Sequence, residues 1–165
     1  MKQFYAKSPN MERLIVLDTE TTGIEPSEGH RIIEVGAVQI LDREITELEF
    51  HRYLQDEVES GRDIVLISAS SQVHVRQVSD HLGLFIDAMG SDADHNLKST
   101  NKITRILQLD PGGKFVYAGN CADDIAVWSE ATEVILVNCS RSLADKLPHH
   151  GDQIKHFDAP LSIAR

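Results

Sequence analysis

The chain has 165 residues, the usual size of one compact domain, and a formal net charge of −10, which gives it no general attraction to a phosphate backbone. Its two cysteines are too few for a disulfide framework or a cysteine-based zinc site. No apolar stretch reaches the roughly 18 residues that a membrane span requires, so we expect a soluble cytoplasmic protein without membrane contact.

The first third of the chain predicts one buried strand and one antiparallel hairpin. Residues 1–12 are polar, and we expect a flexible leader there. The continuous apolar run over 13–18 is typical of a strand buried on both faces. After a turn-rich stretch, the runs 31–40 and 45–54 alternate partly between apolar and polar residues. We therefore expect an antiparallel hairpin over residues 31–54.

From about residue 61 the chain alternates between strand and helix patterns. Strands are predicted within 63–70, 84–91, 114–120 and 132–138, the last of them being the final strand, and helices within 70–83, 100–109 and 123–131. Such alternation predicts a mostly parallel sheet with helices on both faces. The expected fold is thus a three-layer α/β domain over residues 13–145, followed by a loose tail at 146–165.

The first buried strand leads into a pair of carboxylates. Residues 14–23 read LIVLDTETTG, so that Asp18 and Glu20 follow four apolar residues, and EGHRIIEVGAVQILDREI comes soon after. This stretch, 13–55, resembles the opening of the DEDD-type 3′–5′ exonucleases, particularly the epsilon subunit of bacterial DNA polymerase III. The resemblance implies that Asp18 and Glu20 bind two divalent cations, a task that needs several carboxylates. The family's Asn-Ala-x-Phe-Asp context is absent here, and no His in the tail has an Asp five positions on.

Residues 61–140 resemble a second family, the haloacid-dehalogenase-like hydrolases, in particular the domain joined to 4-hydroxybenzoate-type prenyltransferases. The resemblance is carried by IVLISASSQ, HLGLF, GSDADHNLKSTNK and VYAGNCADDIAVWSEA, followed by VILVN. It implies that Ser68 binds phosphate and that Lys98 neutralises the nucleophile and the phosphate. Asp124 matches an acidic metal position, and Asn120 stands where the family often has a metal-binding Asp.

This second half lacks the family's own first strand, which ends in Asp-x-Asp-x-Thr and lies at the centre of a sheet of order 3-2-1-4-5. Residues 18–22 read Asp-x-Glu-x-Thr, so we expect the exonuclease-like strand to fill the central position. The hairpin would then lie where the family has its flap and cap, or extend the sheet as an antiparallel edge. We interpret the chain as a chimera of the two families in one haloacid-dehalogenase-like domain.

Three functions remain open at this stage. In a phosphatase-like hydrolase, Asp18 would attack a phosphorylated small molecule to give an aspartyl-phosphate, and Glu20 would act as acid and then base. Mg²⁺ or Mn²⁺ would be held by Asp18, Glu20, Asn120 and Asp124. In a nuclease, Asp18 and Glu20 would hold the metal while water attacks a nucleic-acid 3′ end. In the third function, the chain is a non-catalytic acidic protein that binds a protein partner.

The same residues also suit ordinary structural roles. Ser68 is a candidate N-cap for the helix within 70–83. Lys98 is a candidate surface lysine, with Lys102 as the alternative for the phosphate-binding role. Asp124 lies in the first turn of a predicted helix, where acidic side chains are favourable because of the helix dipole alone.

Overall fold

The computed structural model describes residues 49–94, 96–98, 100–147 and 154–157 with their side chains, and five short strands before residue 49 by their backbone. Its strands are β1 (Leu14–Leu17), β2 (Thr19–Thr21), β3 (Ile32–Val35), β4 (Ile40–Leu41), β5 (Glu44–Ile45), β6 (Ile64–Ser71), β7 (Asp87–Ser91), β8 (Phe115–Gly119), β9 (Glu133–Val137) and β10 (Ile154–Phe157). Its helices are α1 (Glu49–Glu59), α2 (Gln72–Leu82), α3 (Thr100–Leu109), α4 (Ile125–Trp128) and α5 (Arg141–Ala144), with a 3-10 turn, η2, at Ala122–Asp124. The predicted leader at 1–12 lies outside the described residues.

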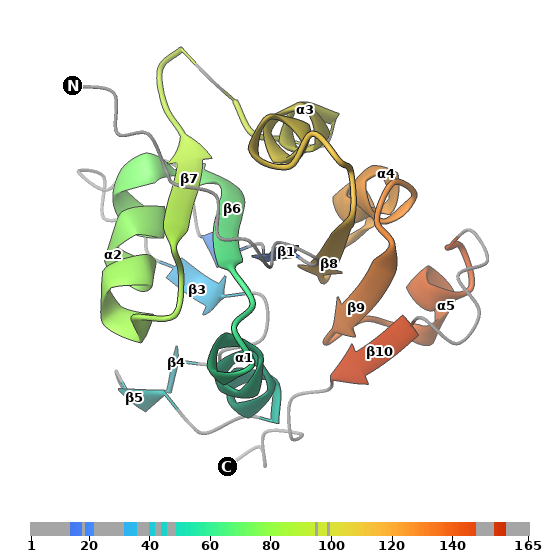
Figure 1. The fold of residues 1–165 in the computed structure, drawn as a ribbon, viewed down its shortest axis with the longest axis horizontal. Coiled ribbons are helices and arrows are strands. Elements are labelled where there is room, and N and C mark those ends of the chain that lie inside the picture. Colours follow the sequence, from blue (N-terminus) through green and yellow to red (C-terminus); the bar gives the residue numbers. More distant parts are fainter. Residues whose placement is uncertain are drawn as a thin grey trace.

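A parallel sheet forms the middle layer of the protein. Its strands follow the order β10-β9-β8-β1-β6-β7, and each neighbouring pair is parallel. β1 lies between β6 and β8, since Val16 pairs with Val65 on one side and with Tyr117 on the other. Helices cover both faces of the sheet (Figure 1). The predicted α/β class with a parallel sheet is confirmed.

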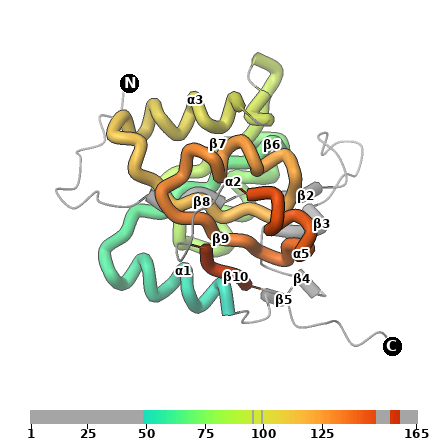
Figure 2. Tube along the Cα trace, turned by 90° about the vertical axis from the view of Figure 1, so that its right-hand side faces the viewer, coloured from blue at the N-terminus to red at the C-terminus, as the bar shows by residue number. Residues whose placement is uncertain are grey.

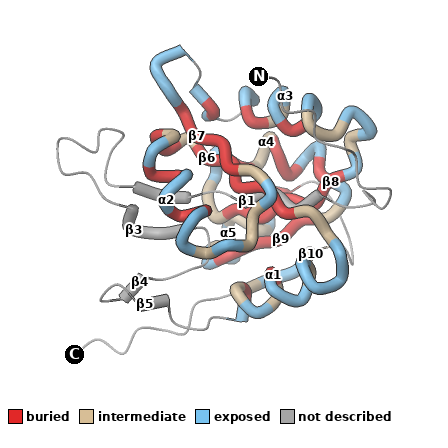
Figure 3. The backbone as a smooth tube through the Cα atoms, turned by 60° about the vertical axis from the view of Figure 1, so that its left-hand side comes forward, coloured by how far each residue is buried: buried red, intermediate tan, exposed pale blue. Residues whose placement is uncertain are grey.

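Two hydrophobic cores lie on the two faces of the sheet. Successive side chains of a strand point to opposite faces, so Ile64 and Leu66 of β6 pack with α1 and α2, whereas Val65 and Ile67 pack with α3 and α4. Figure 2 shows α1 and α3 on opposite sides of β8 and β9. In Figure 3 the buried residues follow the central strands and the inner sides of the helices. The cores are mostly aliphatic, with Trp128 the largest fully buried side chain.

The predicted hairpin over residues 31–54 is wrong in its second half. β3 pairs antiparallel with β2, so that Glu34 lies opposite Glu20, and β4 pairs with β5. Residues 49–59 form α1 instead of a strand. Phe50, Tyr53 and Leu54 repeat at i, i+3 and i+4, which places them on one side of a helix. Phe50 and Leu54 are buried, so packing against the sheet favours the helical period over the partial alternation.

The predicted tail contains a strand that the sequence analysis missed. β10 lies within residues 146–165 and extends the sheet beside β9. Its Phe157 packs against Phe50 and Tyr53 of α1 with ring centroids 5.1 Å apart in both cases. Lys155 Nζ lies 3.3 Å from Tyr53 Oη and donates a hydrogen bond to it. In the part of the chain that the structure describes, no helix is long and apolar enough to cross a membrane.

A side-chain amide completes the sheet where β6 departs from β7. The pairing of the two strands shifts between Ile67 and Ser71. There, Gln72 Nε2 donates to the Ala88 carbonyl at 3.0 Å, and Gln72 Oε1 accepts the Gly90 N–H at 2.7 Å. The backbone of Gln72 approaches so closely that a Cβ on Gly90 would lie 2.6 Å from Gln72 Cα. Only glycine fits at this position without a shift of the backbone.

Replacement of Gly90 by Ala is therefore expected to lower the free energy of unfolding by about 1–3 kcal/mol, the usual range for overpacking. Urea denaturation followed by circular dichroism measures this loss. Gly112→Ala is the matched control, because a Cβ there would meet only the side chain of Asp110. A loss in Gly90→Ala no larger than in Gly112→Ala would contradict the close approach.

Candidate active site

The carboxyl ends of β1, β6 and β8 meet at one edge of the sheet. Leu17, the last residue of β1, pairs with Leu66, and Val16 pairs with Tyr117. Ser68 follows Leu66 within β6, and Asn120 directly follows β8. The chain proceeds from β1 to β6 on one side and returns to β8 on the other. The end of β1 is thus a topological switch point, the place where open α/β sheets bind ligands.

The two carboxylates predicted at this point have no described side chains. Asp18 follows β1 and lies outside the described residues. Glu20 is described by its backbone, which belongs to β2 and pairs with Glu34 of β3. The roles of Asp18 and Glu20 therefore stay predictions, and the site is built from the residues of β6, β8 and their following segments.

A buried network of three polar side chains lies next to this edge. Tyr117 Oη donates to Asp124 Oδ1 at 2.6 Å. Lys102 Nζ donates to the same carboxylate oxygen at 3.2 Å and to Tyr117 Oη at 3.0 Å. Lys102 is 3% exposed, while Tyr117 and Asp124 are fully buried. A charge pair this deep is tolerated because each partner has hydrogen bonds beyond the pair itself.

The second oxygen of Asp124 fixes the turn after β8. Asp124 Oδ2 accepts the backbone N–H groups of Asn120 at 3.1 Å and Cys121 at 3.2 Å, and the Cys121 thiol donates to it at 3.5 Å. A Cβ on Gly119 would lie 2.6 Å from this oxygen. Both carboxylate oxygens are thus engaged by the protein. This arrangement favours a positioning role for Asp124 over the predicted role as a metal ligand.

The two candidate lysines lie in different environments. The side chain of Lys98 is 63% exposed and forms an ion pair at 3.2 Å with Asp123, which is itself 57% exposed. Lys102 lies on the buried side of α3 together with Ile106. Lys98 is thus a surface lysine, the structural role that its sequence position also allowed. Lys102 is the lysine that contacts Tyr117 and Asp124 beside the sheet edge.

Ser68 is fully buried in β6, and its Oγ accepts the N–H of Ser70 at 3.0 Å. It does not cap the following helix. That role belongs to Ser71, whose Oγ accepts the N–H of His74 at 3.4 Å. The predicted glycine stop of the helix is confirmed, because Gly83 ends α2 in the left-handed conformation at φ 65°.

Asn120 presents an unsatisfied acceptor at the switch point. Its Oδ1 is buried, and it has no hydrogen-bond partner in the described part of the chain. Buried polar atoms nearly always have a partner, so an exception in a candidate site calls for an explanation such as a bound ion. Within the described ranges, which exclude the side chains of Asp18 and Glu20, no group of three or more His, Cys, Asp or Glu residues could hold a metal ion.

Tyr117 is the member of the network that the sequence analysis did not single out. Its position inside a buried strand was a usable signal, because a buried tyrosine hydroxyl usually finds a hydrogen-bond partner. The sequence pattern does not say which partner, since Lys102 and Asp124 lie on separate elements, α3 and η2. Their meeting depends on how these elements pack on β8.

Comparisons with known proteins find a sequence resemblance to exonucleases and a fold resemblance to phosphatases. A family model described as Exonuclease matches residues 15–79, so that the match continues beyond residue 55 through β6 into α2. The chain is 51% identical over 45 residues to the DNA polymerase III subunit epsilon of Rickettsia typhi, which covers 27% of this chain and 20% of that protein. It is 33% identical over 96 residues to the uncharacterized protein y4nM of Sinorhizobium fredii, which covers 58% of this chain and 18% of that protein. The chain thus spans about a fifth of the length of these curated relatives.

The fold is similar to that of a solved phosphatase. The cobalt-bound deoxy-D-mannose-octulosonate 8-phosphate phosphatase of Haemophilus influenzae aligns with a TM-score of 0.52 and 10% identity, over 89% of this chain and 77% of that one. The chain therefore shares an α/β fold with this phosphatase, while its start resembles the epsilon subunits in sequence. The predicted combination of two resemblances in one chain is confirmed.

The difference between the two lysines gives a direct test of the network. Lys102→Met is expected to lower the free energy of unfolding by about 3–5 kcal/mol, because it leaves the buried Asp124 carboxylate without its counter-charge. Lys98→Met is the matched control and is expected to change it by less than about 1 kcal/mol, since its ion pair is exposed. Urea denaturation of both variants measures the two values. Similar losses in the two variants would refute the assignment of Lys102 to the network.

Proposed function

We propose that the chain is a phosphoester hydrolase that reacts at the carboxyl ends of β1, β6 and β8. The observation that carries this proposal is the place of β1 in the middle of the parallel sheet. Asp18 follows β1 directly in the sequence, next to the switch point that Ser68 and Asn120 flank. The buried Lys102–Asp124 ion pair lies beside β8 near this edge, and its two charges compensate each other.

The proposed reaction has two steps on Asp18. A carboxylate oxygen of Asp18 attacks phosphorus, the bond from phosphorus to the leaving oxygen breaks, and Glu20 protonates that oxygen. Glu20 then takes a proton from water, which attacks the aspartyl-phosphate and releases phosphate with Asp18 regenerated. Ser68 and Lys102 would stabilise the charge of the phosphoryl group. Lys102 takes here the role that the sequence analysis gave to Lys98.

A divalent cation, Mg²⁺ or Mn²⁺, is part of this proposal. Amide and carboxylate oxygens are the ligands that such ions prefer. The buried Oδ1 of Asn120, which has no partner in the described part of the chain, supports its role as one of them. Asp18 and the Glu20 carbonyl would complete the protein ligands, whereas Asp124 has both oxygens engaged. When bound, the ion would neutralise charge that develops on the phosphoryl group.

The nucleophile gives the sharpest test. Asp18→Asn is expected to reduce hydrolysis of p-nitrophenyl phosphate by at least about 100-fold, as removal of a covalent catalyst does, and to abolish binding of beryllium fluoride in the presence of Mg²⁺. Asp63→Asn is the matched control, because Asp63 precedes β6 and lies at the opposite edge of the sheet. Unchanged activity in Asp18→Asn would refute the proposal.

A 3′–5′ exonuclease is the second candidate, because the Exonuclease model matches residues 15–79. In that case Asp18 and Glu20 would hold metal and water would attack the phosphodiester directly. Mn²⁺-stimulated shortening of 5′-labelled single-stranded DNA, without any beryllium fluoride adduct, would favour this candidate over the phosphatase. Both reactions share the residues Asp18 and Glu20, and they differ in whether Asp18 becomes phosphorylated.

Metal binding separates either enzyme from a non-catalytic acidic protein that binds a protein partner. A ligand that binds only the folded state raises the melting temperature by mass action. Mg²⁺ is therefore expected to raise the melting temperature of the unaltered chain, and to do so less in Asn120→Ala. If Mg²⁺ leaves the melting temperature unchanged and neither activity is present, the non-catalytic function is favoured.

A further inference from the structure

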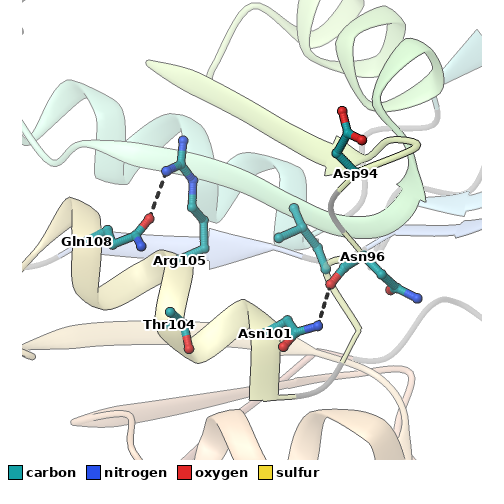
Figure 4. A pocket seen from close by; sticks show the side chains of 7 residues that line it. Asp94, Asn96, Asn101, Thr104, Arg105 and Gln108 are labelled. Atoms are coloured by element: carbon teal, nitrogen blue, oxygen red, sulfur yellow. Dashed lines mark hydrogen bonds between the residues drawn. The ribbon is translucent and has the colours of Figure 1, made fainter.

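A polar pocket of about 300 Å³ lies between α3 and the segment that follows β7. Its lining residues, drawn in Figure 4, are Asp94, Asn96, Leu97, Asn101, Thr104, Arg105 and Gln108. The volume is at the lower end of the range for small-molecule sites. None of its lining residues belongs to the proposed hydrolase site, so the pocket needs an explanation of its own.

The pocket is formed by one helix side and one loop. Asn101, Thr104, Arg105 and Gln108 repeat at i, i+3, i+4 and i+7, so they form a single stripe along α3. This stripe differs from the one that carries the buried Lys102. The opposite wall comes from the segment after β7, where Leu97 is buried and donates its N–H to Ser91 Oγ at 3.0 Å.

Arg105 is held in place by neutral acceptors. Its Nε donates to the sulfur of Met89 at 3.0 Å, and its Nη1 donates to Gln108 Oε1 at 2.9 Å. Among the residues that the structure describes, Arg105 forms no ion pair. The guanidinium is therefore positioned by neutral groups, without an ion-pair partner in the described ranges, in a chain whose net charge is −10. A fixed guanidinium of this kind is suited to a carboxylate or phosphate, which it binds through two parallel N–H groups.

The neighbouring side chains offer polar groups that suit hydroxyls. Asn101 Nδ2 donates to the Asn96 carbonyl at 2.7 Å, which orients the amide and leaves Asn101 Oδ1 to accept. Asn96 Oδ1 accepts the N–H of Lys98 at 2.9 Å, which leaves the Asn96 NH₂ to donate. The Thr104 hydroxyl makes only a long contact of 3.5 Å to the Thr100 carbonyl. The pocket thus offers both donors and acceptors besides Arg105.

We propose that this pocket binds a small polyhydroxylated anion. Its carboxylate or phosphate would lie at Arg105, and its hydroxyls would contact Asn96, Asn101 and Thr104. Asp94, at the loop side of the pocket, would accept a hydrogen bond from a further hydroxyl and would disfavour a second negative charge on the ligand. The proposal is independent of the hydrolase function, because it rests on α3 and its neighbouring loop alone.

The test uses D-gluconate, which joins a carboxylate to a chain of hydroxyls and contains no phosphoester. Titration of the full chain, followed by ¹H–¹⁵N correlation spectra, is expected to shift the side-chain amides of Asn96 and Asn101 and the Nε–H of Arg105. Sorbitol has the hydroxyls without the charge, and acetate has the charge without the hydroxyls. Both are expected to bind at least about tenfold more weakly than gluconate, since each lacks one set of contacts.

Two variants test the assignment of the anion to Arg105. Arg105→Gln removes the charge, and Thr104→Glu adds a carboxylate at an exposed position of the same stripe. Each is expected to weaken gluconate binding at least about tenfold. Arg76→Gln, which makes the same change at an exposed site on α2, is the matched control and should leave the affinity within about twofold.

The proposal is overturned if gluconate shifts none of the pocket signals, or if Arg105→Gln and Arg76→Gln have equal effects. It is also overturned if acetate binds as tightly as gluconate, because the hydroxyl contacts would then contribute nothing. Thermal unfolding of each variant shows whether it folds. Since the two pocket variants change exposed residues on one face of α3, agreement between them excludes a folding defect as the cause of lost binding.

Discussion

The rest of the structure depends on the insertion of β1 between β6 and β8. Both neighbouring strands are parallel to β1. The backbone N–H and C=O groups that β6 and β8 direct toward β1 need hydrogen-bond partners, which β1 supplies. Each buried backbone group left without a hydrogen bond would cost about 1–3 kcal/mol. A strand whose sequence resembles the start of exonucleases thus completes a sheet whose fold resembles that of a phosphatase. The same insertion brings the carboxyl end of β1, which Asp18 follows in the sequence, to the switch point.

The buried Lys102–Tyr117–Asp124 network connects the hydrophobic core beneath α3 and α4 to the candidate site. Its members come from α3, β8 and η2, so the network ties the helix layer to the carboxyl end of a central strand. The carboxylate also holds the backbone of the turn at Asn120 through Oδ2. Glycine at position 119 leaves the space that this carboxylate occupies. The network therefore positions Asn120, whose buried Oδ1 has no hydrogen-bond partner among the residues that the structure describes.

The sequence predicted the regular βα units well and the irregular ends poorly. The helix expected over 100–109 is α3 with the same bounds, and the helix that stops at a glycine is α2. These elements have a clear period and a clear end signal. α1 was predicted as part of a strand because short apolar repeats fit two periods, and burial of Phe50 and Leu54 decides between them. β10 was missed because a four-residue strand with two exposed residues has no distinctive pattern and is formed by pairing with β9.

The sequence by itself determined the α/β class, the two resemblances and the edge at which the site would form. These follow from local patterns, because alternating strands and helices favour parallel pairing, and parallel strands place their carboxyl ends together. Only the tertiary structure decided which lysine is buried and which groups the Asp124 carboxylate contacts. Lys98 precedes α3 and lies at the surface, whereas Lys102 belongs to α3 and is buried by the packing of this helix on the sheet. The hydrogen-bond partners of the Asp124 carboxylate likewise come from other elements, so only their packing shows which of its oxygens are engaged.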